Sequence, residues 1–211
     1  MFDFTALQRY HIPFDHWVGE QSISKGTVKA INDEWPDFSF PGWQVEGATW
    51  SRKGSVIFPD RLPPTAQALS AFLFSDASLD QLSSLLGFRV YGDPWFLDAP
   101  IGSPKLGGGL REIYQGGILG IQRGFEQHPT GFRKAANLLI YLTPNWHEAW
   151  GGSLQLAGAK VKYILPEGGR AVLFPITRNS WHGNTEPVLS PTGITRRSLA
   201  LYLYARSEDM K

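Results

Sequence analysis

The sequence contains no cysteine, so it can form neither disulfide bonds nor thiolate metal sites. It also lacks a concentrated basic segment: 20 Lys and Arg stand against 19 Asp and Glu, and no basic run is longer than the pair Arg196-Arg197. A nucleic-acid binder usually gathers basic residues on one surface, because counterion release supplies much of its affinity. The sequence therefore gives no indication of a nucleic-acid partner.

Long apolar runs are missing as well. No stretch approaches the roughly 20 residues needed to cross a bilayer, so no membrane partner is expected. The N-terminal residues MFDFTALQRYHIPF do not show the charged-then-apolar layout of a signal peptide. Together with the missing cysteine, these features favour a cytoplasmic protein. The oligomeric state is not predicted.

Aromatic residues, glycine and proline are abundant. The 8 Trp, 13 Phe and 7 Tyr exceed what a minimal core needs, and 23 Gly with 15 Pro indicate many turns. This composition favours a β-rich fold that encloses a lined pocket. The length of 211 residues suits one domain with its own core. We therefore predict a single domain over 1–211, in which 1–90 form a mainly helical N-terminal support and 91–211 form the β core.

Three helices are expected in the first 90 residues, each from an N-terminal cap or proline followed by an apolar period. A Gly/Pro-rich stretch between Tyr91 and Gly109 is expected to be a loop over the barrel mouth. The predicted helix boundaries are Ser22 or Ser24 and Trp35 for the first helix, Pro63-Pro64 for the start of the second, and Asp76 or Ser78, then 79–86 and Gly87, for the third.

Strands are expected after Leu110. Residues 135–143 and 197–204 are apolar on both alternating faces, so something must cover their outer face, and the N-terminal helices are the natural cover. In the last strand, the more polar face carries Arg196, Ser198, Ala200, Tyr202 and Tyr204. We predict that this face lines an interior pocket and that the leucine-rich opposite face packs on helices.

Several motifs follow one another in the C-terminal half. They are GGGL at 107–110, GG at 116–117 and HPTGF at 128–132, then NLLIYL, WGGSLQL, WHGNTEP and RRSLALYLY. In this order and spacing, over roughly 86–205, they resemble the prolyl-4-hydroxylase-like branch of the iron(II)/2-oxoglutarate oxygenases. The resemblance implies an α+β, mainly β fold. This is a double-stranded β-helix (a jelly roll or cupin-like barrel) with the N-terminal helices packed on its outer face.

The resemblance also implies a metal site, which here is incomplete. Family members bind iron through His-X-Asp on one strand and a distant second His, and these ligands occupy one face of the ion. His182 in SWHGN matches the distant His. Gln122 stands in the first His position, as a weak candidate ligand, and Gly124 stands in the Asp position. The loss of two ligands is expected to weaken ferrous iron binding strongly.

The residues that bind 2-oxoglutarate in the family match this sequence better than the metal ligands do. Arg196 and Ser198 correspond to the family's Arg-X-Ser, in which the arginine grips the distal carboxylate through two parallel hydrogen bonds. Tyr141 corresponds to a tyrosine that helps to hold the same carboxylate, and core packing is its alternative role. Arg197 is the rival candidate for the carboxylate contact. The resemblance thus implies Fe(II) and 2-oxoglutarate as cofactors, with the iron site broken.

Three functions follow from these residues. The first is a 2-oxoglutarate-dependent dioxygenase that hydroxylates or otherwise oxidises an unactivated C–H of an unidentified small molecule or peptide side chain. The second is a pseudoenzyme that uses the barrel pocket for ligand or protein binding. The third is a halogenase-like enzyme, because the resemblance extends to halogenating family members, which carry Gly or Ala at the position of Gly124 and bind chloride there, or a non-oxidative enzyme. Candidate residues for non-oxidative chemistry are Arg111, Glu112, Arg123 and Glu126.

Two further groups of residues bear on the site. His128 lies four positions beyond Gly124, and its HP context matches a family position that is not a ligand, so we interpret it as structural. Trp43, Trp95 and Phe96 are candidates for contact with a ring or an apolar side chain of the substrate.

Overall fold

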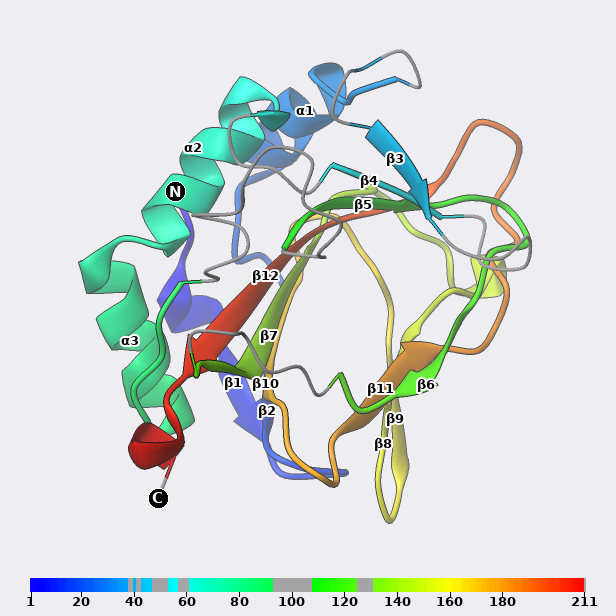
Figure 1. The fold of residues 1–211 in the computed structure, drawn as a ribbon. Helices are drawn as coiled ribbons and strands as arrows, with labels where there is room; N and C mark the ends of the chain where they lie inside the picture. The colour runs from blue at the N-terminus through cyan, green and yellow to red at the C-terminus, as the bar shows by residue number, and fades with distance from the viewer. Residues whose placement is uncertain are drawn as a thin grey trace.

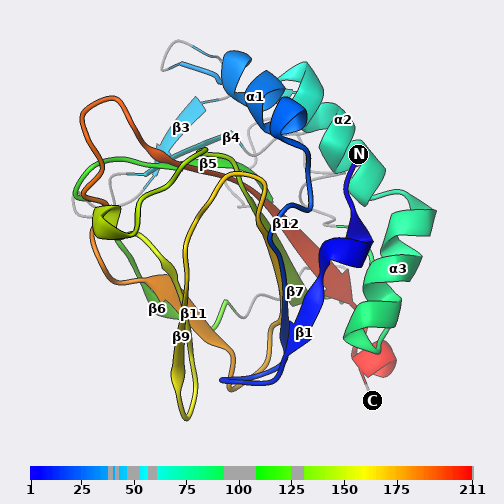
Figure 2. The same ribbon diagram turned by 180° about the vertical axis from the view of Figure 1, so that it is seen from behind.

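The computed structural model describes residues 1–37, 40, 43–46, 53–56, 61–92, 108–124 and 131–210. Two antiparallel sheets face each other, and helices pack on the outside of one of them (Figures 1 and 2). This arrangement confirms the predicted mainly β, double-stranded β-helix fold. Among the described residues, no helix has the length and apolar character required to span a membrane.

The larger sheet has the strand order β1-β2-β10-β7-β12-β5-β4-β3, and the smaller sheet has the order β6-β11-β8-β9. The strands of the larger sheet are β1 (Gln8–Tyr10), β2 (His16–Gly19), β3 (Trp43–Glu46), β4 (Lys53–Val56), β5 (Gly109–Ile113), β7 (Arg133–Tyr141), β10 (Ala171–Pro175) and β12 (Arg196–Ala205). Those of the smaller sheet are β6 (Leu119–Gln122), β8 (Leu154–Ala157), β9 (Val161–Ile164) and β11 (Trp181–Asn184).

The first two helices begin where the sequence predicts. In α1 (Lys25–Asp33), the Ser24 hydroxyl accepts the Thr27 backbone N–H at 3.1 Å, which satisfies a donor that has no partner within the helix. In α2 (Pro64–Leu73), proline occupies the first turn, where its missing N–H costs nothing.

The third helix, α3 (Asp76–Leu86), begins earlier than predicted. Its cap is Ser75, whose hydroxyl accepts the Ser78 backbone N–H, so Asp76 and Ser78 lie inside the helix. Gly87 ends it with φ of 78°, as expected for a left-handed C-terminal residue. Short 3₁₀ turns complete the described helical elements: η1 (Phe4–Ala6), η3 (Glu148–Trp150) and η4 (Ser207–Met210).

The two faces of β12 divide as the sequence predicts. Leu199, Leu201 and Leu203 are fully buried and belong to the apolar cluster that includes Ile31 of α1 and Leu73 of α2. The alternate residues face the space between the sheets. The helices therefore cover the outer face of the larger sheet (Figure 2), which leaves its inner face available for a ligand.

The N-terminal segment also supplies strands, which the sequence analysis did not anticipate. β2 pairs with β10, and β4 pairs with β5, so both extend the larger sheet. These strands have only three or four residues, too few for a clear alternating pattern. Most of the loop predicted between Tyr91 and Gly109, with Trp95 and Phe96, lies outside the described residues.

Truncation of a helix-facing leucine will test this packing. We expect Leu201→Ala to lower the free energy of unfolding by about 2–5 kcal/mol, because the site is closed on all sides and a cavity remains. Leu189→Ala, at a side chain that is 58% exposed, is the matched control and should change stability by less than about 0.5 kcal/mol. Chemical denaturation measures both. Equal effects would contradict the assignment of the core.

A buried histidine in β2 predicts a pH dependence. His16 is fully buried, and burial is the main cause that lowers its pKa below the usual value of about 6.5. The folded protein then binds fewer protons than the unfolded chain, so this contribution to stability is complete above pH 6.5 and decreases as the pH falls below it. His16→Asn should lose less stability than the unchanged protein between pH 7.5 and pH 5. The exposed His147→Asn serves as control, and identical pH slopes for all three proteins would refute the assignment.

Candidate functional site

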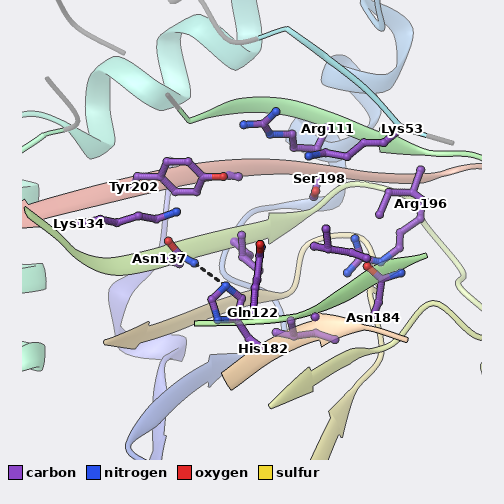
Figure 3. Close-up of a pocket in the computed structure, with 16 residues that line it drawn as sticks. Lys53, Arg111, Gln122, Lys134, Asn137, His182, Asn184, Arg196, Ser198 and Tyr202 are labelled. Atoms are coloured by element: carbon purple, nitrogen blue, oxygen red, sulfur yellow. Dashed lines mark hydrogen bonds between the residues drawn. The ribbon is translucent and has the colours of Figure 1, made fainter. Parts of the chain in front are cut away.

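A cavity of about 90 Å³ lies between the two sheets (Figure 3). A space of this size holds several water molecules or part of a small ligand. Arg196, Ser198, Ala200 and Tyr202 line the cavity from β12, as the alternation in the sequence predicts. Tyr204 does not line it, because the register of β12 with β7 shifts between Leu203 and Tyr204. Side chains from β6 and β11 line the opposite wall, and they include Gln122, His182 and Asn184.

His182 is held by two hydrogen bonds within the protein. Its Nδ1 lies 3.2 Å from the Ser180 carbonyl oxygen, which can only accept, so Nδ1 carries the proton of the neutral ring. Nε2 is then an acceptor, and it lies 3.3 Å from the Asn137 side-chain nitrogen, which donates to it. Burial lowers the pKa of His182 to about 4, so the ring is neutral at physiological pH. The ring nitrogen that faces the cavity therefore already has a partner.

The two positions of the missing ligands lie beside this ring. Gln122 on β6 is the direct cross-strand partner of His182 on β11, and its side chain is exposed at the cavity wall. Gly124 has φ of 65°, and a Cβ added to it would lie 3.0 Å from His182 Cε1 and 3.4 Å from Nε2. A side chain at position 124 would therefore be strained by this φ and crowded against the imidazole.

Arg196 is buried at the other end of the cavity, and its partners are neutral. Its Nε donates to the Gly152 carbonyl oxygen at 2.7 Å, and its Nη2 donates to the Tyr141 hydroxyl at 3.3 Å. Burial lowers the pKa of Arg196 and raises that of Tyr141, since both charged forms lose hydration. Tyr141 is fully buried behind the guanidinium and does not line the cavity, whereas Ser198 does.

The rival arginine lies on the opposite face. Arg197 stacks over Trp35 at 4.7 Å from the ring centroid, and it donates to Glu112 Oε1 at 3.2 Å and to Asn32 Oδ1 at 2.9 Å. Glu112 also accepts hydrogen bonds from the Trp35 indole and the Thr195 hydroxyl. Neither Arg197 nor Glu112 therefore lines the cavity.

Of the other residues predicted from the sequence to act in the site, only some line the cavity. Arg111 lines the cavity, whereas Arg123 is exposed and lies 4.7 Å over the Trp181 ring. Trp43 lies on β3, and it is not among the residues that line the cavity. Glu126 and His128 lie outside the described residues.

Four polar or charged cavity residues were not identified from the sequence: Lys53, Lys134, Asn137 and Asn184. Asn137 had a visible signal, because it interrupts an otherwise apolar strand on the same face as Tyr141. Lys134 had no such signal in the sequence, because simple alternation along β7 places it on the face opposite to Asn137. The register steps from Ala136 to Lys134 while β12 advances by one residue, so Ala135 is an extra residue. This bulge turns Lys134 toward the cavity.

Residues 114–204 match the family model described as the 2OG-Fe(II) oxygenase superfamily. No curated protein matches the sequence significantly. Among solved structures, the chain is similar to a prolyl hydroxylase from Trichoplax adhaerens, in complex with a hypoxia inducible factor oxygen degradation domain peptide fragment. The identity is 16%, the match covers 90% of this chain and 83% of that one, and the TM-score is 0.65.

Two further structures have the same fold. A prolyl-4-hydroxylase from Pseudomonas putida has 15% identity, with 91% of this chain and 93% of that one covered and a TM-score of 0.60. HygX from Streptomyces hygroscopicus, solved with nickel, 2-oxoglutarate and hygromycin B, has 12% identity, coverage of 91% and 83%, and a TM-score of 0.56. At such identities, these structures share the fold alone. Over residues 114–204 the chain is thus similar to the 2OG-Fe(II) oxygenase superfamily, and its fold is that of the prolyl-4-hydroxylases.

Proposed function

We propose that this protein binds 2-oxoglutarate, or a closely similar dicarboxylate, in the barrel cavity without the iron-dependent turnover of its superfamily. It would then act as a ligand-binding pseudoenzyme. One contrast carries the proposal. The cavity-facing nitrogen of His182 already accepts a hydrogen bond from Asn137, whereas buried Arg196 has only neutral partners among the described residues.

The residues around Arg196 fit a carboxylate. A buried guanidinium without an anion carries a large desolvation cost, and a carboxylate would both balance the charge and accept two parallel hydrogen bonds. Asn184 is also buried, and its side-chain nitrogen has no hydrogen-bond partner. Both residues line the same cavity as the Ser198 hydroxyl. A bound dicarboxylate would supply the missing acceptors, and these side chains would orient it.

The residues around His182 do not fit ferrous iron. One imidazole is left of the family's three ligands, and Gln122 offers only a neutral amide. Gly124 has no side chain and so offers no side-chain ligand, and a side chain added there would crowd the ring. No group of three or more His, Asp and Glu capable of holding a metal occurs in the parts of the chain that the structure describes. A single neutral ligand binds ferrous iron weakly against water.

The other hypotheses have less support from the geometry. The match to the 2OG-Fe(II) oxygenase model favours an active oxygenase, which would hydroxylate or otherwise oxidise its substrate. That chemistry needs iron, which the described residues do not fit. A halogenase would also need the second histidine, where Gln122 stands. Non-oxidative chemistry through Glu112 is disfavoured because this carboxylate lies outside the cavity, bonded to Arg197.

Thermal unfolding with ligand will test the carboxylate site. Saturating 2-oxoglutarate should raise the melting temperature, because binding at 100 times Kd adds about 2.7 kcal/mol to stability by mass action. Arg196→Ala should abolish this shift and Arg196→Lys should reduce it, since lysine cannot make the paired contact. The exposed Arg178→Ala is the matched control and should keep the full shift. A full shift in Arg196→Ala, each protein being compared with its own ligand-free form, would refute the assignment.

Metal analysis will test the second half of the proposal. After anaerobic loading with ferrous iron and desalting, the protein should retain far less than one equivalent, no more than His182→Ala does. Consumption of 2-oxoglutarate should stay at the protein-free background, and its thermal shift should be the same with ferrous iron or with EDTA. Near-stoichiometric iron with 2-oxoglutarate turnover would instead establish an active oxygenase, and His128→Ala would then show whether a residue outside the described ranges is a ligand.

A further inference from the structure

The cavity wall formed by the larger sheet is positively charged. Four cationic side chains line it and, among the described lining residues, there is no Asp or Glu. Lys53 and Arg111 also contact other groups. A pocket of one sign of charge with low-dielectric walls concentrates ligands of the opposite sign. A dicarboxylate bound at Arg196 would balance the charge of that arginine, but the charge of Lys134 would still lack a counter-ion among the described residues.

Lys134 is a buried cation whose charge no described carboxylate balances. The side chain is 6% exposed, and its Nζ lies 3.2 Å from the centroid of the Tyr202 ring, a close cation–π contact. The cross-strand partner of Lys134 is Tyr204, eight positions beyond Arg196 on β12. At about 3.3 Å per residue, these strand positions are roughly 26 Å apart. Lys134 and Arg196 accordingly enter the cavity from opposite ends (Figure 3).

Asn137 provides an acceptor at the same end. It is the cross-strand partner of Tyr202, and Figure 3 shows it between Lys134 and His182. Because the His182 tautomer requires a donor at Nε2, the Asn137 nitrogen points to the ring and its oxygen points elsewhere. That oxygen is buried and has no hydrogen-bond partner. A buried acceptor in this state favours a ligand that carries a donor.

We infer that the Lys134 end of the cavity is a second anion subsite, which takes a small polar acid. Its carboxylate or phosphate would lie on the Lys134 ammonium, and its hydroxyl or amine would donate to the free oxygen of Asn137. This inference deepens the proposed function, on which it rests for the cavity being a ligand site. The dicarboxylate occupies the Arg196 end, and the second acid occupies the end beside His182.

The charge of Lys134 also acts at His182. Burial is the main cause of the lowered His182 pKa, the Ser180 contact raises it, and the Lys134 charge lowers it further. Figure 3 shows Lys134 and His182 at the same end of the cavity, so the ammonium charge acts there on any bound anion.

Two probes and four variants will test the subsite. The probes are inorganic phosphate and L-lactate, a 2-hydroxy carboxylate, each titrated calorimetrically at an ionic strength held constant with chloride. The variants are Lys134→Met, Lys134→Arg, the exposed control Lys160→Met and Arg196→Ala. We expect Lys134→Met to raise the Kd of the bound probe about tenfold or more and to keep the 2-oxoglutarate shift. Lys134→Arg, Lys160→Met and Arg196→Ala should retain probe binding, and circular dichroism verifies folding.

Each outcome of these titrations either supports or refutes the second anion subsite. Binding of phosphate alone assigns a phosphorylated ligand, and binding of lactate alone assigns a hydroxy acid. If Lys134→Met binds both probes like the unchanged protein, or if neither probe binds the unchanged protein more than chloride does, the subsite is refuted. Loss of probe binding in Arg196→Ala but not in Lys134→Met would also refute it, since one site would then explain both ligands. If 2-oxoglutarate fails to bind while phosphate binding depends on Lys134, the subsite stands and the proposed function falls.

Discussion

The pairing of β7 with β12 fixes the arrangement of the rest of the molecule. The two strands form the centre of the larger sheet, and successive side chains on each must point to opposite faces. On one face, Leu199, Leu201 and Leu203 need an apolar cover, and α1 and α2 supply it. Once that face is committed to the helices, Arg196 and Ser198 can only point between the sheets. A polar interior is therefore a consequence of how the exterior is packed.

The charged side chains of that interior lower the stability of the fold. Two buried cations, Arg196 and Lys134, have only neutral partners among the described residues, and each buried charge costs several kcal/mol unless it is compensated. His182, by contrast, is neutral and bonded on both ring nitrogens. Beside His182, however, the Asn137 side-chain oxygen has no hydrogen-bond partner, and elsewhere on the cavity wall the Asn184 side-chain nitrogen has none. Buried charges and polar atoms that lack partners are what we expect of a cavity that binds polar ligands.

Much of this could be predicted from the sequence, because the decisive signals are local. The two-residue period of β12 predicted which residues line the cavity, and Ser24, Pro64 and Gly87 predicted helix ends through their own backbone preferences. Other features depend on partners that are distant in the sequence. Short strands such as β2 and β4 form because β10 and β5 offer free edges. The orientation of Lys134 depends on a bulge at Ala135, which only the pairing with β12 reveals.

The left-handed backbone at Gly124 limits which side chains this position can accept. A Cβ at residue 124 would lie 3.0 Å from His182 Cε1, at a φ that side chains rarely adopt. A substitution that adds a carboxylate here would therefore have to move the imidazole or the local backbone by a few tenths of an ångström. The conformation of one turn thus sets the energetic cost of placing a second polar group beside the ring.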